Sequence, residues 1–124
     1  MKDILLVEDN LINQRLAIAI FRKANYTFDT ADNGKDALKL VQKNKYGIIL
    51  MDIQMPIMDG IEATIEIRKY EDLNKLIPTP IFAVTAYTEE NDTERFLDIG
   101  INDCIRKPFN YQQLIEFIEK NNNR

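Results

Sequence analysis

Histidine is absent from this 124-residue chain, and cysteine occurs once, at Cys104. Without histidine, the chain cannot form a Ser-His or Cys-His catalytic pair, and it cannot bind zinc through imidazole. A single cysteine excludes an internal disulfide and is typical of a protein in a reducing, cytoplasmic compartment. Protein classes that depend on these groups are therefore excluded.

Long apolar runs and an excess of positive charge are also missing. No apolar stretch is long enough to cross a bilayer, and Glu8 and Asp9 interrupt the first one early. We therefore expect no signal peptide, no transmembrane segment and no membrane contact. The net charge of −4 offers no basic face for direct binding of nucleic acid.

The composition that remains is typical of one globular domain. Hydrophobic residues make up 45% of the chain and charged residues 29%, a mixture that favours a packed core over disorder. We expect a single domain over residues 1–124, with its core at about 2–120 and a polar tail at 121–124.

Apolar runs typical of strands alternate along the chain with amphipathic stretches typical of helices. Strands are predicted at about 3–7, 26–31, 48–51, 81–84 and 104–106, and helices at about 11–23, after Asn33-Gly34, and at about 61–70, 89–99 and 111–118. The run at 48–51 should be buried on both faces, and the polar helix at 89–99 should be held least firmly. Five strand–helix units imply an α/β fold with parallel strands, a doubly wound three-layer sandwich, although periodicity leaves the strand order open.

Charged or hydroxylic residues stand where four of these strands end. Glu8 and Asp9 follow the first strand, Asp52 the third, Thr85 the fourth and Lys107 the fifth. The carboxyl ends of parallel strands meet at one edge of the sheet, where open α/β sheets bind their ligands. The sequence therefore predicts a crevice with three acids, one hydroxyl and one ammonium group.

Three clustered carboxylates need a compensating cation. At a separation of about 5 Å and an effective dielectric constant near 20, each pair would repel by roughly 3 kcal/mol. A few oxygen ligands in a site open to water suit Mg²⁺, and Mn²⁺ by the same argument.

The same crevice suits phosphoryl transfer, because the oxygens of the moving group must be neutralised. The metal would take one oxygen, the Lys107 ammonium a second, and the Thr85 hydroxyl with nearby backbone N–H groups a third. Asp52 is the candidate nucleophile, since it stands alone at the end of the central strand.

Each of these residues taken alone has a plainer structural explanation. Glu8 and Asp9 would solvate a loop or begin a helix, and Asp52 would cap the following turn. Thr85 would be an ordinary strand residue and Lys107 a solvated lysine. Their coincidence at the ends of four different strands favours the functional interpretation.

Five short motifs in this order resemble the receiver domain of two-component response regulators, over about residues 2–120. They are Val7-Glu8-Asp9-Asn10, Met51-Asp52-Ile53-Gln54-Met55-Pro56, Met58-Asp59-Gly60, Thr85-Ala86 and Lys107-Pro108-Phe109. The resemblance implies a flavodoxin-like sheet of order 2-1-3-4-5 and a cis Lys107–Pro108 bond.

The resemblance also implies roles for the crevice residues. Asp52 would be the phosphoacceptor, and Thr85 and Lys107 would bind the phosphoryl group. The metal ligands would be Asp9, Asp52 and the backbone carbonyl of Gln54, with Glu8 assisting through water.

A receiver takes its phosphoryl group from a phosphohistidine on a histidine kinase or a histidine phosphotransfer domain. This chain has no histidine of its own, so in such a relay it can only receive. Phosphorylation would shift an equilibrium between two conformers and remodel the surface of the fourth helix, fifth strand and fifth helix. Such a chain is a signalling phosphoacceptor that assists its own phosphorylation and dephosphorylation, not an enzyme. Its motifs are most similar to receivers of hybrid sensor histidine kinases.

Two positions bear on how such a switch would behave. The family usually has an aromatic or histidine residue three positions before the lysine, where this chain has Cys104, so we expect weaker or differently routed coupling. Gln54 and Tyr87 occupy positions that tune the access of water to the aspartyl phosphate, and the bulk of Tyr87 predicts a longer-lived phosphate.

Three other functions compete with this interpretation. A haloacid dehalogenase-type phosphohydrolase needs a second aspartate at position 54, which is Gln54. A flavodoxin-like FMN module needs a hydroxyl- and amide-rich loop, and Glu8-Asp9 would repel the phosphate. A degenerate receiver, acting as a phosphorylation-independent interaction module, usually lacks one of the key residues, and none is missing here. The cognate kinase and the oligomeric state stay open.

Overall fold

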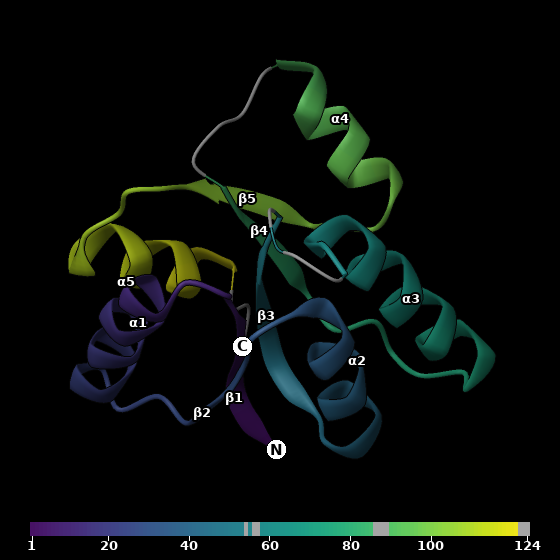
Figure 1. The fold of residues 1–124 in the computed structure, drawn as a ribbon, viewed down its shortest axis with the longest axis horizontal. Helices are drawn as coiled ribbons and strands as arrows, with labels where there is room; N and C mark the ends of the chain where they lie inside the picture. Colours follow the sequence, from purple (N-terminus) through teal and green to yellow (C-terminus); the bar gives the residue numbers. More distant parts are fainter. Residues whose placement is uncertain (54, 56–57, 86–89, 122–124) are drawn as a thin grey trace.

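In this computed structural model, a sheet of five parallel strands forms the centre of the molecule. Figure 1 shows the sheet between the helices. The structure describes residues 1–53, 55, 58–85 and 90–121, with the backbone alone for 90–93. The strands lie in the order β2-β1-β3-β4-β5, which confirms the predicted order. Their bounds are β1 Lys2–Val7, β2 Phe28–Ala31, β3 Tyr46–Asp52, β4 Ile81–Thr85 and β5 Asp103–Arg106.

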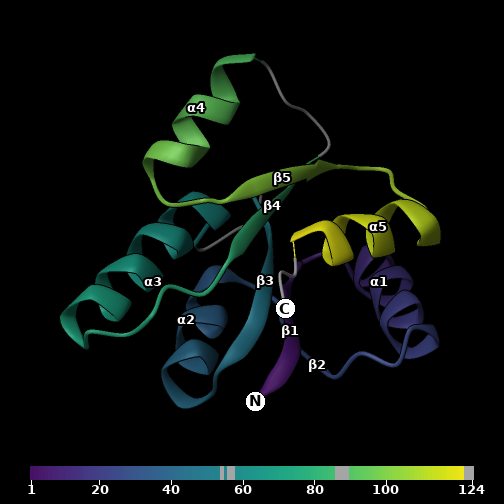
Figure 2. The same cartoon turned by 180° about the vertical axis from the view of Figure 1, so that it is seen from behind.

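Helices cover both faces of this sheet. Figures 1 and 2 show α1 and α5 on one face, α2 and α3 on the other, and α4 beside the edge strand β5. The bounds of the helices are α1 Leu11–Lys23, α2 Gly34–Lys43, α3 Gly60–Leu73, α4 Glu90–Asp98 and α5 Tyr111–Asn121. The three-layer, doubly wound α/β sandwich is therefore confirmed. No helix in the described ranges is long and apolar enough to cross a bilayer.

Short polar side chains begin the helices that follow β1, β2 and β3. Asn10, Asn33 and Asp59 each accept a hydrogen bond from the backbone N–H three residues later, which satisfies a donor that the first helical turn leaves open. These caps lie at the carboxyl edge of the sheet, so they fix how the chain leaves each strand next to the predicted crevice.

Several predicted boundaries differ from the structure; β3 begins at Tyr46 and α5 ends at Asn121, for example. Two of the differences have a visible physical cause. The second strand begins at Phe28 and not at 26, because the N–H of Tyr26 donates to the carbonyl of Phe21 and Asn25 has a φ of 62°. Residues 24–26 therefore form the turn that closes α1 and precedes β2. Helix α3 continues to Leu73, three residues further than predicted, through a buried acidic residue described below.

Apolar side chains pack on both faces of β3, as predicted for the run at 48–51. One cluster lies between the sheet and α2, α3 and α4, and includes Met51, Ala63, Ile67 and Phe96. The other lies between the sheet and α1 and α5, and includes Leu50, Ala17, Phe21, Leu114 and Ile118. The central strand is thus rigid on both sides, which gives Asp52 at its end a fixed position.

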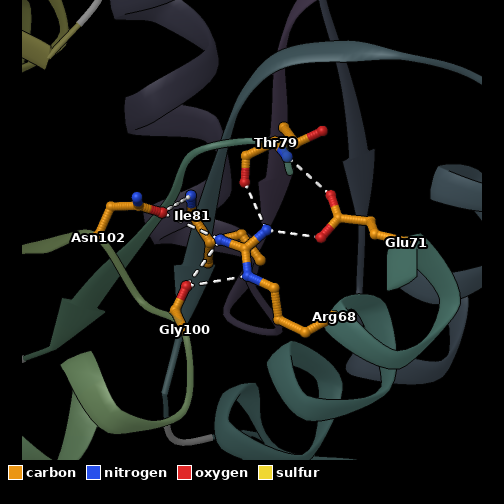
Figure 3. Close-up of polar contacts among 6 residues, drawn as sticks. All are labelled: Arg68, Glu71, Thr79, Ile81, Gly100 and Asn102. Atoms are coloured by element: carbon orange, nitrogen blue, oxygen red, sulfur yellow. Dashed lines mark hydrogen bonds and ion pairs between the residues drawn. The ribbon is translucent and has the colours of Figure 1, made fainter. Parts of the chain in front are cut away.

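At the opposite edge of the sheet, Arg68 joins α3 to the segments that precede β4 and β5 (Figure 3). Its Nη1 donates to the Glu71 carboxylate at 2.7 Å and to the Thr79 carbonyl at 2.8 Å. Its Nη2 and Nε both donate to the Gly100 carbonyl, and Nη2 also donates to Asn102 Oδ1. All five N–H donors of the guanidinium are used, so the beginnings of β4 and β5 are tied to α3.

Gly100 is required where α4 ends. Its φ is +100°, and a Cβ there would lie 2.8 Å from Nε of Arg68. The N–H groups of Gly100 and Ile101 donate to Leu97 and Phe96, closing the last turn of α4. Gly100 therefore caps the C-terminus of α4.

Candidate functional site

Three carboxylates meet at the carboxyl edge of the two central strands. Glu8 and Asp9 follow β1, and Asp52 ends β3, which pairs with β1 in the register Val7 opposite Met51. One carboxylate oxygen from each acid lies within 4.8 Å of the others. Glu8 and Asp52 are buried and Asp9 is exposed, so the cluster opens to solvent on the Asp9 side.

Lys107 reaches this cluster from the turn after β5. Its Nζ donates to both carboxylate oxygens of Glu8, at 2.9 and 3.1 Å, and lies 3.6 Å from Oδ2 of Asp52. Its backbone N–H donates to the Thr85 carbonyl at 2.8 Å, and the Lys107–Pro108 bond is cis, as the resemblance implied. One ammonium therefore faces two of the three acids, leaving the cluster negative.

Thr85 ends the strand beside Asp52. The register places Asp52 opposite Val84, and the Ile53 N–H donates to the Val84 carbonyl at 3.3 Å. Thr85 is itself buried at this edge. The structure thus brings together the five predicted residues at positions 8, 9, 52, 85 and 107. Gln54 and Tyr87, predicted as a metal ligand and as a shield of the phosphate, lie outside the described residues.

Gly60 allows α3 to start directly against the acidic strand end. A Cβ at this position would lie 2.2 Å from the Asp52 carbonyl oxygen, and the Gly60 N–H donates to the Ile53 carbonyl. Any side chain here would push the segment after Asp52 away from the sheet. The Met-Asp-Gly motif therefore has a packing role next to the candidate phosphoacceptor.

Gln14 of α1 is a neighbour of the site that sequence reasoning missed. Its side-chain amide donates to the Glu8 carbonyl and to Asp32 Oδ1, both at 2.8 Å. The spacing along the helix could have indicated that Gln14 is buried, because it shares the inward face of α1 with Ala17 and Phe21. An amide on the inward face of a helix needs polar partners, and here they belong to the crevice.

The donor set fits a hard divalent cation. All three groups are carboxylates, one of them is exposed, and the cluster holds no sulfur or imidazole. Such a set suits Mg²⁺ or Mn²⁺, which accept a few carboxylate ligands and complete their shells with water, and does not suit a structural zinc site.

An apolar surface adjoins the crevice. Leu11, Ile12 and Leu16 of α1 are exposed. A pocket of about 280 Å³ beside them is lined by Asn13, Leu16, Lys107, Pro108 and Phe109. Lys107 therefore borders both this pocket and the acidic cluster.

Cys104 lies in β5 where the resemblance leads one to expect a larger side chain. It is half-buried and lines a pocket of about 130 Å³ with Phe96, Leu97 and Ile101 beneath α4. Burial raises the pKa of its thiol, and the neighbouring Asp103 carboxylate raises it further. The small side chain thus leaves space between α4 and the sheet.

Known proteins share this arrangement. The family model of the response regulator receiver domain matches residues 4–119. Hybrid signal transduction histidine kinases B and I of Dictyostelium discoideum are 39% and 42% identical over 99% and 93% of this chain. The matched region is 7% of each kinase, so this chain corresponds to a small part of those relatives.

Solved structures agree with these relatives. The receiver domain of the Saccharomyces cerevisiae response regulator Ssk1, co-crystallised with the histidine phosphotransfer protein Ypd1, is 33% identical with a TM-score of 0.91. That match covers 98% of this chain and 88% of the other. A sensor histidine kinase receiver domain from Pseudomonas aeruginosa PAO1, with magnesium coordinated in its active-site cleft, is 36% identical with a TM-score of 0.83. Here 96% of this chain and 95% of the other are covered.

The family match extends over nearly all of the sequence, and the observed sheet order and structural neighbours agree with it. The chain belongs to the response regulator receiver domain family.

Proposed function

We propose that this chain accepts a phosphoryl group on Asp52 from a phosphohistidine of a partner protein, in the presence of Mg²⁺. The observation that carries the proposal is the cluster of Glu8, Asp9 and Asp52 within 4.8 Å, with the Lys107 ammonium 3.6 Å from Asp52. An isolated carboxylate cluster of this kind is unfavourable without a cation, and a lysine beside it suits an anionic ligand.

In the proposed reaction, a carboxylate oxygen of Asp52 forms a bond to phosphorus while the phosphorus–nitrogen bond breaks. The electron pair of that bond leaves with the imidazole nitrogen of the partner. Glu8, Asp9 and Asp52 would hold the cation, which when bound neutralises charge on the phosphoryl oxygens. Lys107 would turn from Glu8 toward a phosphoryl oxygen, and the Thr85 hydroxyl would donate to another.

The partner in this proposal is a histidine kinase or a histidine phosphotransfer domain. The apolar side chains of Leu11, Ile12 and Leu16 are exposed beside the crevice, so a partner docked on α1 would bring its histidine to Asp52 and exclude water. The related Ssk1 receiver was crystallised with a phosphotransfer protein, which supports a partner of this class.

The same proposal makes the chain a switch and not an enzyme with turnover of external substrates. Phosphorylation would draw Thr85 toward the phosphate and shift the surface formed by α4, β5 and α5. Cys104 is small and leaves a pocket beneath α4 where it meets Phe96, so we propose that coupling passes through the packing of Phe96 under α4.

The test is the intact mass of the chain after incubation with acetyl phosphate, with and without Mg²⁺. Wild type should gain a single phosphoryl group only with Mg²⁺, and the adduct should be labile in base. Asp52→Asn should gain none, whereas the matched control Asp72→Asn, at an exposed position of α3, should behave as wild type. A wild type that stays unmodified would contradict the proposal and favour a phosphorylation-independent interaction module.

A further inference from the structure

Gln14 is a buried polar residue whose side-chain amide donates hydrogen bonds to residues of the crevice. Its side chain is on the inward face of α1, and the residue is only 8% exposed. The two hydrogens of its NH₂ group go to the Glu8 carbonyl and to Asp32 Oδ1, each at 2.8 Å. Both partners are acceptors, so the nitrogen and not the oxygen of the amide must face them.

Hydrogen bonds hold the main chain of Glu8 at both its N–H and its carbonyl. The Glu8 N–H donates to the Ala31 carbonyl at 3.0 Å, while the Glu8 carbonyl accepts from Gln14. The Glu8 carboxylate is held separately by Lys107. The Gln14 contact therefore restrains the carbonyl of the peptide that joins Glu8 to Asp9.

Gln14 also acts on the other neighbour of Asp9. Its backbone N–H donates to the Asn10 carbonyl at 2.9 Å, and the Asn13 N–H donates to Asn10 Oδ1 at 3.0 Å. One residue thus bonds the carbonyl groups on both sides of Asp9, one with its side chain and the other with its main chain.

Asp9 depends on these restraints more than the other acids do. Its side chain is exposed, and its carboxylate makes no hydrogen bond or ion pair with the side chains in the described ranges. Glu8 and Asp52 are buried and face Lys107. The backbone alone keeps the Asp9 carboxylate within 4.8 Å of the other two.

We infer that Gln14 is a positioning residue for the cation site, acting by holding the Glu8–Asp9 peptide so that Asp9 faces Glu8 and Asp52. The inference rests on the proposed function, in which these acids hold Mg²⁺. Asp32, directly after β2, accepts the second hydrogen of the Gln14 amide, so the end of β2 is bonded to Gln14 as well. Residues that orient metal ligands in this way typically change metal affinity by 10–100-fold when replaced.

The experiment is a titration of the ¹⁵N-labelled chain with MgCl₂, followed by the amide shifts of Asp9 and Asn10. Gln14→Met keeps the length of the side chain but removes both donors, and should weaken Mg²⁺ binding about tenfold. Gln14→Asn keeps an amide that is too short to reach both acceptors, and should fall between this variant and wild type. Gln112→Met, the same change at an exposed glutamine of α5, should leave the Kd unchanged.

A dispersed spectrum shows that each variant is folded, and the melting temperature without metal separates stability from binding. A Gln14→Met protein that melts earlier but binds Mg²⁺ with the wild-type Kd would show a merely structural role and overturn the inference. If Gln14→Met does not fold, the Gln14→Asn Kd decides, and a wild-type value overturns the inference. Wild type without Mg²⁺ binding would overturn this inference and the proposed metal site together, whereas the acetyl phosphate experiment tests phosphoryl acceptance separately.

Discussion

The Lys107 ammonium lies closer to Glu8 than to the other two acids of the crevice. Both of its short contacts are to Glu8, its distance to Asp52 is 3.6 Å, and Asp9 has no such contact among the described side chains. Without a metal, Asp9 therefore contributes repulsion that no described side chain offsets through a direct contact. The carboxylates of the site therefore repel one another in the metal-free protein, and a bound cation would offset this repulsion.

Replacing Asp9 with Asn should therefore stabilise the metal-free protein. We expect the free energy of unfolding in chelator to rise by about 1 kcal/mol, less than the unscreened repulsion because Asp9 is exposed. Urea denaturation in EDTA measures this change, and the stabilisation that MgCl₂ gives to wild type should shrink in the variant. Asp72→Asn serves as the control, and an Asp9→Asn protein less stable than wild type in EDTA would refute the argument.

At the level of the elements, local signals predicted most of the structure and distant contacts set the rest. Asn10 and Gly100 are residue types that favour the ends of helices, and both stand at helix ends in the structure. The end of α3 could not be predicted this way, because Glu71 looks like a solvent-exposed acid in the sequence. In the structure it is 3% exposed, and it accepts hydrogen bonds from Arg68 and from the Thr79 N–H. Contacts with Thr79, 8 to 11 positions further along the chain, thus bury this last turn of the helix.

The contacts of Arg68 (Figure 3) lead us to expect that replacing this residue destabilises α3 and the segments bound to it. In Arg68→Met, the buried Glu71 carboxylate loses its cation, so the free energy of unfolding should fall by about 3 kcal/mol. Urea denaturation measures the loss, and the amides of Gly100 to Asn102 should lose protection from hydrogen exchange first.

The neighbouring Lys69→Met provides the control for this prediction. Lys69 pairs with Glu66 on the exposed face of the same helix, so its loss should change the stability by less than about 0.5 kcal/mol. Equal effects of the two substitutions would mean that the Arg68 contacts do not hold the segments together.

For the whole molecule, the sequence predicted the α/β class, and its motifs, through the resemblance, the strand order and the residues that meet in the crevice. These follow from a rule of topology, because parallel strands place their carboxyl ends at one edge. The contacts that individual side chains make could not be predicted from the sequence. The preference of Lys107 for Glu8 and the reach of Gln14 to Asp32 depend on how helices pack, and no pattern along the chain encodes those distances.

The opposite edge of the sheet carries a polar group of its own, which links three strands. The Tyr46 hydroxyl donates to Asp29 Oδ2 at 2.6 Å, and the Lys2 ammonium contacts Oδ1 of the same carboxylate. The Lys2 and Tyr46 contacts hold the pKa of Asp29 below its usual value. Burial, reinforced by the hydrogen bond to Asp29, raises the pKa of Tyr46 above its usual value.

The raised pKa of Tyr46 predicts a loss of stability in alkali. A phenol whose pKa is higher in the folded than in the unfolded state stabilises the fold fully below the unfolded value of about 10, and this contribution is lost as the pH rises toward the folded value. Between these values, Tyr46 should lower the free energy of unfolding by about 1.4 kcal/mol per pH unit. Urea denaturation of wild type and Tyr46→Phe from pH 7 to 11 isolates this slope, since every other titrating group is shared. Parallel pH profiles of the two proteins would show that the Tyr46 phenol titrates alike in both states and that its burial against Asp29 does not couple to folding.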